Sequence, residues 1–241
     1  MVSGNSVCKT KSGDFRRRTR FACDCTIIKD GRVLVNNHFI KSDKYNIDEL
    51  NDKIYVDNEL IEFHQFYYIL LNKPAGYVSS TEIERNYPPV TDLVSEYNFA
   101  KIFPVGRLDV DTTGVLLLSN NGQLAHKLLS PKYHVDKTYL VTTDYPLQKE
   151  MIVAFEKGVI LDDEKLLPAK LEILSSNEAR VTIHQGKYHQ VKRMFLHYGL
   201  TVIKLEREKF AFLDVKDLSS GEYRLLNNDE INKLLKLVEE K

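Results

Sequence analysis

The sequence of 241 residues lacks the features that mark several classes of protein. Its three cysteines (Cys8, Cys23 and Cys25) are an odd and sparse set with the wrong spacing for a zinc knuckle, so we expect reduced thiols. No apolar stretch is long enough to cross a bilayer, and the N-terminus lacks the apolar core of a signal peptide. We therefore expect a cytoplasmic protein that does not engage a membrane.

An excess of charge of either sign is also missing, because 34 basic residues balance 34 acidic residues. This balance argues against a protein that coats nucleic acid by bulk attraction. It allows a local basic face, since salt screens each charge beyond about 10 Å. Such a face could be an N-terminal arm that binds phosphate, although a solvated tail explains the arm equally well. The basic residues of the arm are Lys9, Lys11, Arg16, Arg17, Arg18 and Arg20.

The composition, with 43% hydrophobic and 28% charged residues, is that of an ordinary globular protein. The length suits one large domain, or a small domain joined to a medium one. Residues 23–29 suit a short helix that Asp30-Gly31 ends, and residues 32–37 and 52–57 suit strands that run into turns. We therefore predict a small α+β module over residues 1–64, with the domain boundary near residue 64.

The second domain, residues 65–241, alternates strands with a few helices. Apolar or alternating segments predict strands at 66–71, 114–119, 138–142 and 179–183. Amphipathic spacing predicts helices at 123–129, at 188–198 before Gly199, and from about Asn228, which we expect to be the N-cap. The pattern indicates an α+β domain with a mainly antiparallel sheet.

The run 106–114 places one acidic side chain, Asp109, between two apolar segments and two glycines that allow close approach of a ligand. Arg107 lies two residues earlier, so it can point to the same side, keep the carboxylate ionised and hold a phosphate. A hairpin loop whose Asp and Thr side chains cap backbone groups explains the run about equally well. Asp109 and Asp111 could also pair on a metal, but no third carboxylate follows at calcium-loop spacing, so we expect no metal site.

A second cluster, at residues 186–195, interleaves basic, aromatic and amide side chains at an expected helix start. Lys187, Lys192 and Arg193 could meet phosphates, and His189 with Gln190 could meet sugar or base edges. The alternative is a basic surface helix whose apolar residues belong to the core. It explains the apolar residues well but the density of polar ones less well.

A third element, Lys137-Thr138-Tyr139, lies in an expected strand that puts Lys137 and Tyr139 on one face. A tyrosine near a carboxylate can stack on a base or relay a proton. The sequence has 13 tyrosines, so Tyr139 is not distinctive by itself.

At these three points the sequence resembles the RsuA-type branch of the pseudouridine synthases (RsuA, RluB, RluE and RluF). Residues 106–114 resemble the family's GRLDxxTxG run, residues 137–139 its KTY element and residues 186–194 its GKYHQVKRM element. Residues 71–77 resemble the LNKPxGY entry strand and residues 221–226 the closing strand, so the resemblance covers residues 66 to about 232. Residues 29–36 and 52–58 resemble parts of an S4 RNA-binding module, whose usual opening helix has no counterpart in residues 1–18.

The resemblance implies a pseudouridine synthase fold behind an S4-like module, and an isomerase that needs no cofactor or metal. Asp109 is the implied catalytic carboxylate, which attacks C1′ of the sugar or removes the C2′ proton. Lys192 would lower its pKa and orient it, with Arg193 as the alternative. Arg107 would hold the flipped nucleotide and Tyr139 would stack on the uracil. The implied substrate-binding residues are Arg107, Tyr139, Gln190, Lys192 and Arg193.

The implied substrate is ribosomal RNA or a ribosomal assembly particle, acted on by a monomer. The motifs look closest to the small-subunit enzyme, which implies 16S rRNA and a uridine 516 type site. A 23S rRNA enzyme of the same branch is the alternative. A non-catalytic ribosome-assembly protein is a rival, although pure binding needs no isolated carboxylate facing anionic RNA. A glycosidase using Asp109 and Asp111 is a second rival, although such acids normally face each other across a sugar.

Overall fold

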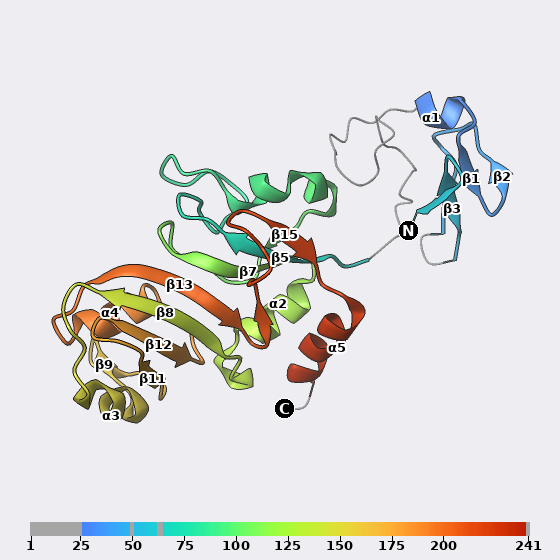
Figure 1. Ribbon diagram of the computed structural model, residues 1–241. Coiled ribbons are helices and arrows are strands. Elements are labelled where there is room, and N and C mark those ends of the chain that lie inside the picture. The colour runs from blue at the N-terminus through green and yellow to red at the C-terminus, as the bar shows by residue number, and fades with distance from the viewer. Residues whose placement is uncertain (1–25, 49–50, 62–64, 240–241) are drawn as a thin grey trace. The chain divides into compact units, whose positions relative to one another are not determined.

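The computed structural model describes residues 26–48, 51–61 and 65–239 (Figure 1). The chain divides into two compact units. The first runs to Gln65 and includes Ser95–Ala100, and the second contains Phe66–Val94 and the chain from Lys101 onward. The basic arm, the three cysteines, the region compared with an S4 opening helix and the first residues of the helix expected at 23–29 lie outside the described residues.

The first unit contains a small antiparallel sheet next to a short helix. Asn36-Asn37 and Asp57-Asn58 take left-handed conformations at two hairpin turns, which suits these turn-forming residues. Buried aliphatic side chains from the helix and two strands form the core of this unit. The last strand, β4 (Glu59–Ile61), was not predicted from the sequence. The elements are α1 (Thr26–Lys29), β1 (Val33–Val35), β2 (His38–Phe39), β3 (Ile54–Val56) and β4 (Glu59–Ile61), in the sheet order β2-β1-β3-β4.

In the described part of the second unit, nine strands form one mixed sheet (Figure 1). The order is β11-β12-β8-β13-β7-β5-β15, with β14 beside β13 and β6 beside β7. Every described pair is antiparallel except β13 with β7, so the predicted mainly antiparallel sheet is confirmed. The strands are β5 (Tyr68–Lys73), β6 (Phe103–Pro104), β7 (Thr113–Ser119), β8 (Lys137–Thr143), β11 (Lys170–Ile173), β12 (Glu178–Ile183), β13 (Val202–Phe210), β14 (Leu213–Asp214) and β15 (Tyr223–Leu225). A separate hairpin pairs β9 (Ile160–Leu161) with β10 (Glu164–Lys165).

Strand β13 lies at the centre of the sheet, between β8 and β7, although no strand is predicted there from the sequence. Its pairing register with β8 shifts between Val202 and Lys204 and again between Arg207 and Lys209. Such irregularities break the alternation of buried and exposed side chains that marks a strand in sequence. The strands predicted at 66–71 and 114–119 are apolar on both faces and appear as β5 and β7.

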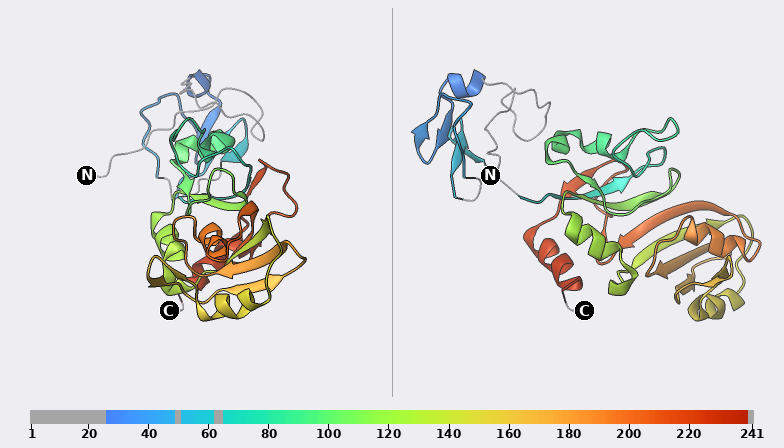
Figure 2. Two further views of the ribbon diagram at one scale, coloured as in Figure 1. Left: turned by 90° about the vertical axis from the view of Figure 1, so that its left-hand side faces the viewer. Right: turned by 180° about the vertical axis from the view of Figure 1, so that it is seen from behind.

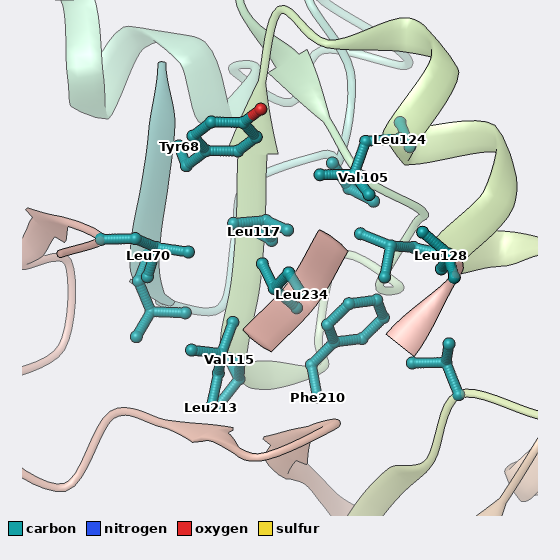
Figure 3. Packing of buried hydrophobic residues seen from close by; sticks show 14 of the residues in the cluster. Tyr68, Leu70, Val105, Val115, Leu117, Leu124, Leu128, Phe210, Leu213 and Leu234 are labelled. Atoms are coloured by element: carbon teal, nitrogen blue, oxygen red, sulfur yellow. The ribbon is translucent and has the colours of Figure 1, made fainter. Parts of the chain in front are cut away.

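Two helices, α2 (Gly122–Leu129) and α5 (Asn228–Leu237), lie side by side (Figures 1 and 2). Their apolar faces join side chains of β5 and β7 in one core cluster, which includes Leu70, Leu117 and Leu234 (Figure 3). The N-cap of α5 is Asn227, and the expectation of Asn228 is wrong by one residue. The Asn227 side chain accepts a hydrogen bond from the backbone N–H of Glu230, whose carboxylate returns one to the Asn227 N–H, a capping box.

The helices α3 (Glu150–Lys157) and α4 (Gln190–Leu196) contact each other through Phe155 and Phe195, whose ring centroids are 5.3 Å apart. Helix α4 is shorter than the predicted 188–198 at both ends, and it begins only at Gln190 because His189 has a left-handed backbone (φ 48°) that cannot continue a helix. The 3₁₀ segments of the described ranges are η1 (Val90–Ala100), which a non-helical Val94 (φ −125°, ψ 33°) divides, and η2 (Pro131–Tyr133). None of the helices in the described ranges has the length and apolar character needed to span a bilayer.

Candidate active site

Asp109 lies in a loop that leaves β6 and enters β7, as the sequence predicts. The loop makes a tight turn, since the backbone N–H of Thr112 donates to the Asp109 carbonyl oxygen at 3.1 Å. At its end, Gly114 (φ 98°) pairs with Arg207 of the parallel strand β13. A Cβ at this position would overlap the Arg207 carbonyl oxygen, so only glycine allows the two strands to approach this closely.

Lys73, the last residue of β5, holds this loop through hydrogen bonds to its backbone. Its side chain is fully buried, and its Nζ donates to three loop carbonyl oxygens, those of Asp109 at 3.1 Å, Val110 at 3.3 Å and Thr112 at 2.8 Å. It also donates to the Pro74 carbonyl oxygen at 3.1 Å. Burial lowers the pKa of Lys73 to about 8, against the attraction of two nearby aspartates. The sequence offered a signal, a lysine ending an apolar strand, but the role of this residue was not predicted.

Two further contacts fix the loop to the segment after β5. The backbone N–H of Gly76 donates to the Val110 carbonyl oxygen at 2.8 Å. The Ser79 hydroxyl donates to the Leu108 carbonyl oxygen and accepts from the Leu108 N–H, each at 2.9 Å. The entry strand and the acidic loop are therefore one connected structure, and the backbone on either side of Asp109 is held in place.

The Asp109 carboxylate meets two side chains from the 186–195 cluster. Lys192 Nζ lies 3.2 Å from Asp109 Oδ2, and His189 Nε2 lies 3.5 Å from Oδ1, so each carboxylate oxygen has its own nitrogen neighbour. Lys192 also donates to Asp111 at 2.7 and 2.9 Å. The structure thus brings together two clusters that are about eighty residues apart in sequence.

The pKa values of Asp111 and Lys192 favour the charged forms of both groups. Partial burial raises the pKa of Asp111, but the hydrogen bonds and charge of Lys192 outweigh it, and the net pKa is lowered. Partial burial likewise lowers the pKa of Lys192, but both aspartates raise it above its ordinary value. One ammonium group therefore holds both acids of the loop, and Lys192 stays protonated well above neutral pH.

Arg107 does not take the expected place beside Asp109. Its guanidinium donates to Glu84 at 2.7 Å and is 65% exposed. The hydrogen bond from Arg107 is the main reason why the pKa of Glu84 is lowered. Arg107 thus lies at the rim of the site, where its charge is open to solvent and its carboxylate partner could be exchanged for a phosphate.

The other three predicted binding residues, Tyr139, Gln190 and Arg193, are buried or paired with another residue. Tyr139 lies in β8 opposite Val181 and Arg207, and only 7% of it is exposed. Gln190 was expected to meet sugar or base edges, but it is buried. Its side-chain oxygen accepts a hydrogen bond from the Lys187 N–H, so it holds a turn rather than an open binding edge. Arg193 pairs with Asp162, so Lys192 alone occupies the position next to Asp109 for which Arg193 was the alternative.

Two more cations lie buried in the sheet. Arg207 is 2% exposed, donates from Nε to the Val115 carbonyl oxygen at 2.7 Å, and packs over the Phe210 ring. Lys137 packs over the same ring and donates to the Val135 carbonyl oxygen, and burial lowers its pKa to about 8. Besides burial, the charge of Arg207 lowers the pKa of both Lys73 and Lys137, so Arg207 lies close enough to both lysines to repel them.

Other candidate sites are weaker. Within the described ranges, no three His, Cys, Asp or Glu side chains are grouped so that they could hold a metal ion. A polar cavity of about 640 Å³ lies against one face of β11, β12 and β13. Along these strands, the residues that line the cavity alternate with buried residues. No residue of the Asp109 cluster lines it. Its lining includes Thr138, Lys170, Glu172, Arg180, Thr182, Glu206 and Glu208.

The comparison with known proteins agrees with this arrangement. Residues 67–197, which hold Asp109, Tyr139 and Lys192, match the family described as RNA pseudouridylate synthase. The chain belongs to the pseudouridine synthase family. The synthase is 40% identical over 207 residues to the Ribosomal small subunit pseudouridine synthase A of Escherichia coli K12, with 85% of this chain and 89% of that protein covered. It is 37% identical over 219 residues to the Ribosomal large subunit pseudouridine synthase B of Bacillus subtilis, with 88% and 89% covered.

A solved structure supports the fold of the synthase as well. The crystal structure of a pseudouridylate synthase matches with a TM-score of 0.66 and 40% identity, and the match covers 87% of this chain and 91% of that one. The predicted fold and the RsuA-type branch are therefore confirmed. The synthase is an isomerase, which makes the acidic loop its candidate reaction centre.

Proposed function

We propose that the synthase converts one uridine of ribosomal RNA to pseudouridine, with Asp109 as the catalytic carboxylate. The observation that carries this proposal is the way in which Asp109 is held. Lys73 fixes its backbone from below, and Lys192 and His189 stand at its two oxygens. A carboxylate held in a fixed position is what attack on C1′, or removal of the C2′ proton, requires.

The proposed reaction exchanges one bond of the sugar for another. The C1′–N1 bond breaks, the released uracil rotates, and a C1′–C5 bond forms. The C5 proton leaves and N1 takes up one proton, so that the product is an isomer of the substrate. Lys192 orients the Asp109 carboxylate through their ion pair, and Tyr139 stacks on the uracil and relays a proton. Arg107 leaves Glu84 to hold a phosphate of the flipped nucleotide. Gln190 acts indirectly, by holding the turn that carries His189.

For the substrate, we propose small-subunit (16S) rRNA and a uridine 516 type site. The small-subunit enzyme named above supports this choice. The similarity to a large-subunit synthase favours 23S rRNA as the second candidate. We further propose that the first unit is an S4-like RNA-binding module spanning residues 1–64, and that the enzyme works as a cytoplasmic monomer on ribosomal RNA or an assembly particle.

The test is a pseudouridine map of 16S and 23S rRNA from cells that lack the protein and from the same cells after its gene is restored. We expect one pseudouridine of 16S rRNA to disappear and to return on restoration. Loss of a 23S site instead would move the substrate to the large subunit. Unchanged maps of both RNAs would refute the proposal.

A further inference from the structure

An aromatic pair extends from the Asp109 carboxylate towards solvent. The rings of Tyr188 and His189 stack with their centroids 3.8 Å apart and their planes 18° apart. The inner ring belongs to His189, whose Nε2 lies 3.5 Å from Asp109 Oδ1. The outer ring belongs to Tyr188, which is 73% exposed. The pair therefore presents a flat aromatic surface next to the reaction centre.

The backbone holds this pair firmly. The Gln190 N–H donates to the Lys187 carbonyl oxygen at 3.1 Å, and the buried Gln190 side chain accepts from the Lys187 N–H at 3.0 Å. The His189 carbonyl oxygen then accepts from the Arg193 N–H at 2.9 Å, at the start of α4. The backbone that carries both rings is fixed in this way, and the Tyr188 ring is stacked on His189, so a ligand that stacks on that ring has less conformational freedom to remove.

A single exposed aromatic ring is common and carries no meaning alone. Here its position matters, because the ring lies beside two aspartates whose charge repels the RNA backbone, and the basic side chains around them are paired with carboxylates. A contact that does not depend on charge, such as base stacking on an aromatic ring, holds RNA at this place without breaking those pairs. The pairs are Arg107 with Glu84, Lys187 with Glu164, Lys192 with Asp109 and Asp111, and Arg193 with Asp162.

We propose that Tyr188 is the stacking platform for a nucleobase next to the target uridine, an inference that rests on the proposed RNA substrate. When the target base leaves its stack to reach Asp109, its neighbour loses a stacking partner. The exposed face of Tyr188 replaces that partner, and His189 supports the ring from behind. The contact acts on RNA binding and on the choice of sequence around the target, and it leaves the chemical step unchanged.

The experiment measures pseudouridine formation by the full-length enzyme on a ribosomal RNA fragment that contains the target. Tyr188→Ala should raise KM about tenfold with kcat within about twofold of wild type, and Tyr188→Phe should restore KM. Tyr145→Ala is the matched control, because Tyr145 is also well exposed (66%) but lies in the loop after β8. This control should behave like wild type.

RNA fragments with an abasic ribose on the 5′ or the 3′ side of the target identify the stacked base. On one of them, wild type and Tyr188→Ala should have the same KM. Equal KM values for Tyr188→Ala and Tyr145→Ala on intact RNA would overturn this inference and leave the proposed function intact. An inactive wild-type enzyme on both ribosomal RNAs would refute the proposed substrate and this inference with it.

Discussion

Replacing Lys73 by methionine separates the stability of the synthase from its activity. The change keeps a long apolar side chain but removes the donor to the loop carbonyl oxygens. Two of the four acceptors keep another partner, because the Asp109 oxygen also accepts from Thr112 and the Val110 oxygen from Gly76. Lys73→Met therefore leaves two carbonyl oxygens, those of Thr112 and Pro74, without the donor that they have now.

Two opposing contributions to the free energy of unfolding keep its decrease small. Leaving two carbonyl groups without a donor costs about 1–3 kcal/mol each. Against this, the change removes a buried charge. Lowering the pKa of Lys73 from 10.5 to about 8 costs the folded state about 3 kcal/mol at neutral pH, since one pKa unit is worth about 1.4 kcal/mol. We therefore expect the free energy of unfolding to fall by no more than about 3 kcal/mol.

The activity should fall much further. Without Lys73 the loop backbone around Asp109 loses the group that joins three of its carbonyl oxygens and that of Pro74 to one another, and a misplacement of about 1 Å can cost about 100-fold in rate. Urea unfolding measures the stability, and release of tritium from RNA labelled at C5 of uridine measures kcat. Lys137→Met is the matched control, since it removes another buried lysine with a pKa of about 8 that does not bind the loop. A Lys73→Met enzyme with kcat within threefold of wild type would refute the reasoning.

Three further predictions follow from the same structure. Gly114→Ala should lower the free energy of unfolding by about 3 kcal/mol or more, because the new Cβ meets the Arg207 carbonyl oxygen. Urea unfolding measures this loss. Gly76→Ala is the control and should cost less, because it adds strain at a positive φ without a clash. Lys192→Met should reduce kcat about 10- to 100-fold in the tritium assay, with Lys192→Arg retaining more activity, and equal rates for the two variants would contradict the role of the charge. The third prediction concerns pH. Lys137 has a pKa of about 8 in the folded protein, against the ordinary value of 10.5 that we take for the unfolded chain. Between these two pH values the unfolded chain binds more protons than the folded protein, so the free energy of unfolding rises with pH. Unfolding curves from pH 7 to 10 should show wild type gaining up to about 3 kcal/mol relative to Lys137→Met, and parallel curves would contradict this.

The local parts of the fold could be predicted because their signals are local. The apolar run at 114–119 and the amphipathic run at 123–129 became β7 and α2 within one residue at each end. Strand β13 could not be predicted, since its two register shifts disturb the alternation that a strand shows. The N-cap of α5 was ambiguous in the sequence, because two adjacent asparagines were both suitable.

The site shows the same division between local and distant interactions. The acidic loop could be identified from the sequence. The family resemblance also predicted that Lys192 lies next to Asp109, although more than eighty residues separate them. Sequence spacing could not show that Arg107 pairs with Glu84, or that Gln190 turns inward to the Lys187 N–H. The first contact depends on the fold, which places Glu84 beside Arg107, and the second depends on the turn that places the Lys187 N–H beside Gln190.

The central claim, that Asp109 performs the chemistry, is tested most directly by Asp109→Asn. Pseudouridine formation on the ribosomal RNA fragment is measured together with the Kd for the same RNA. Because the amide is nearly the same size but cannot ionise, we expect RNA binding within a few-fold of wild type and no detectable pseudouridine. A normal yield of pseudouridine from Asp109→Asn would contradict the account.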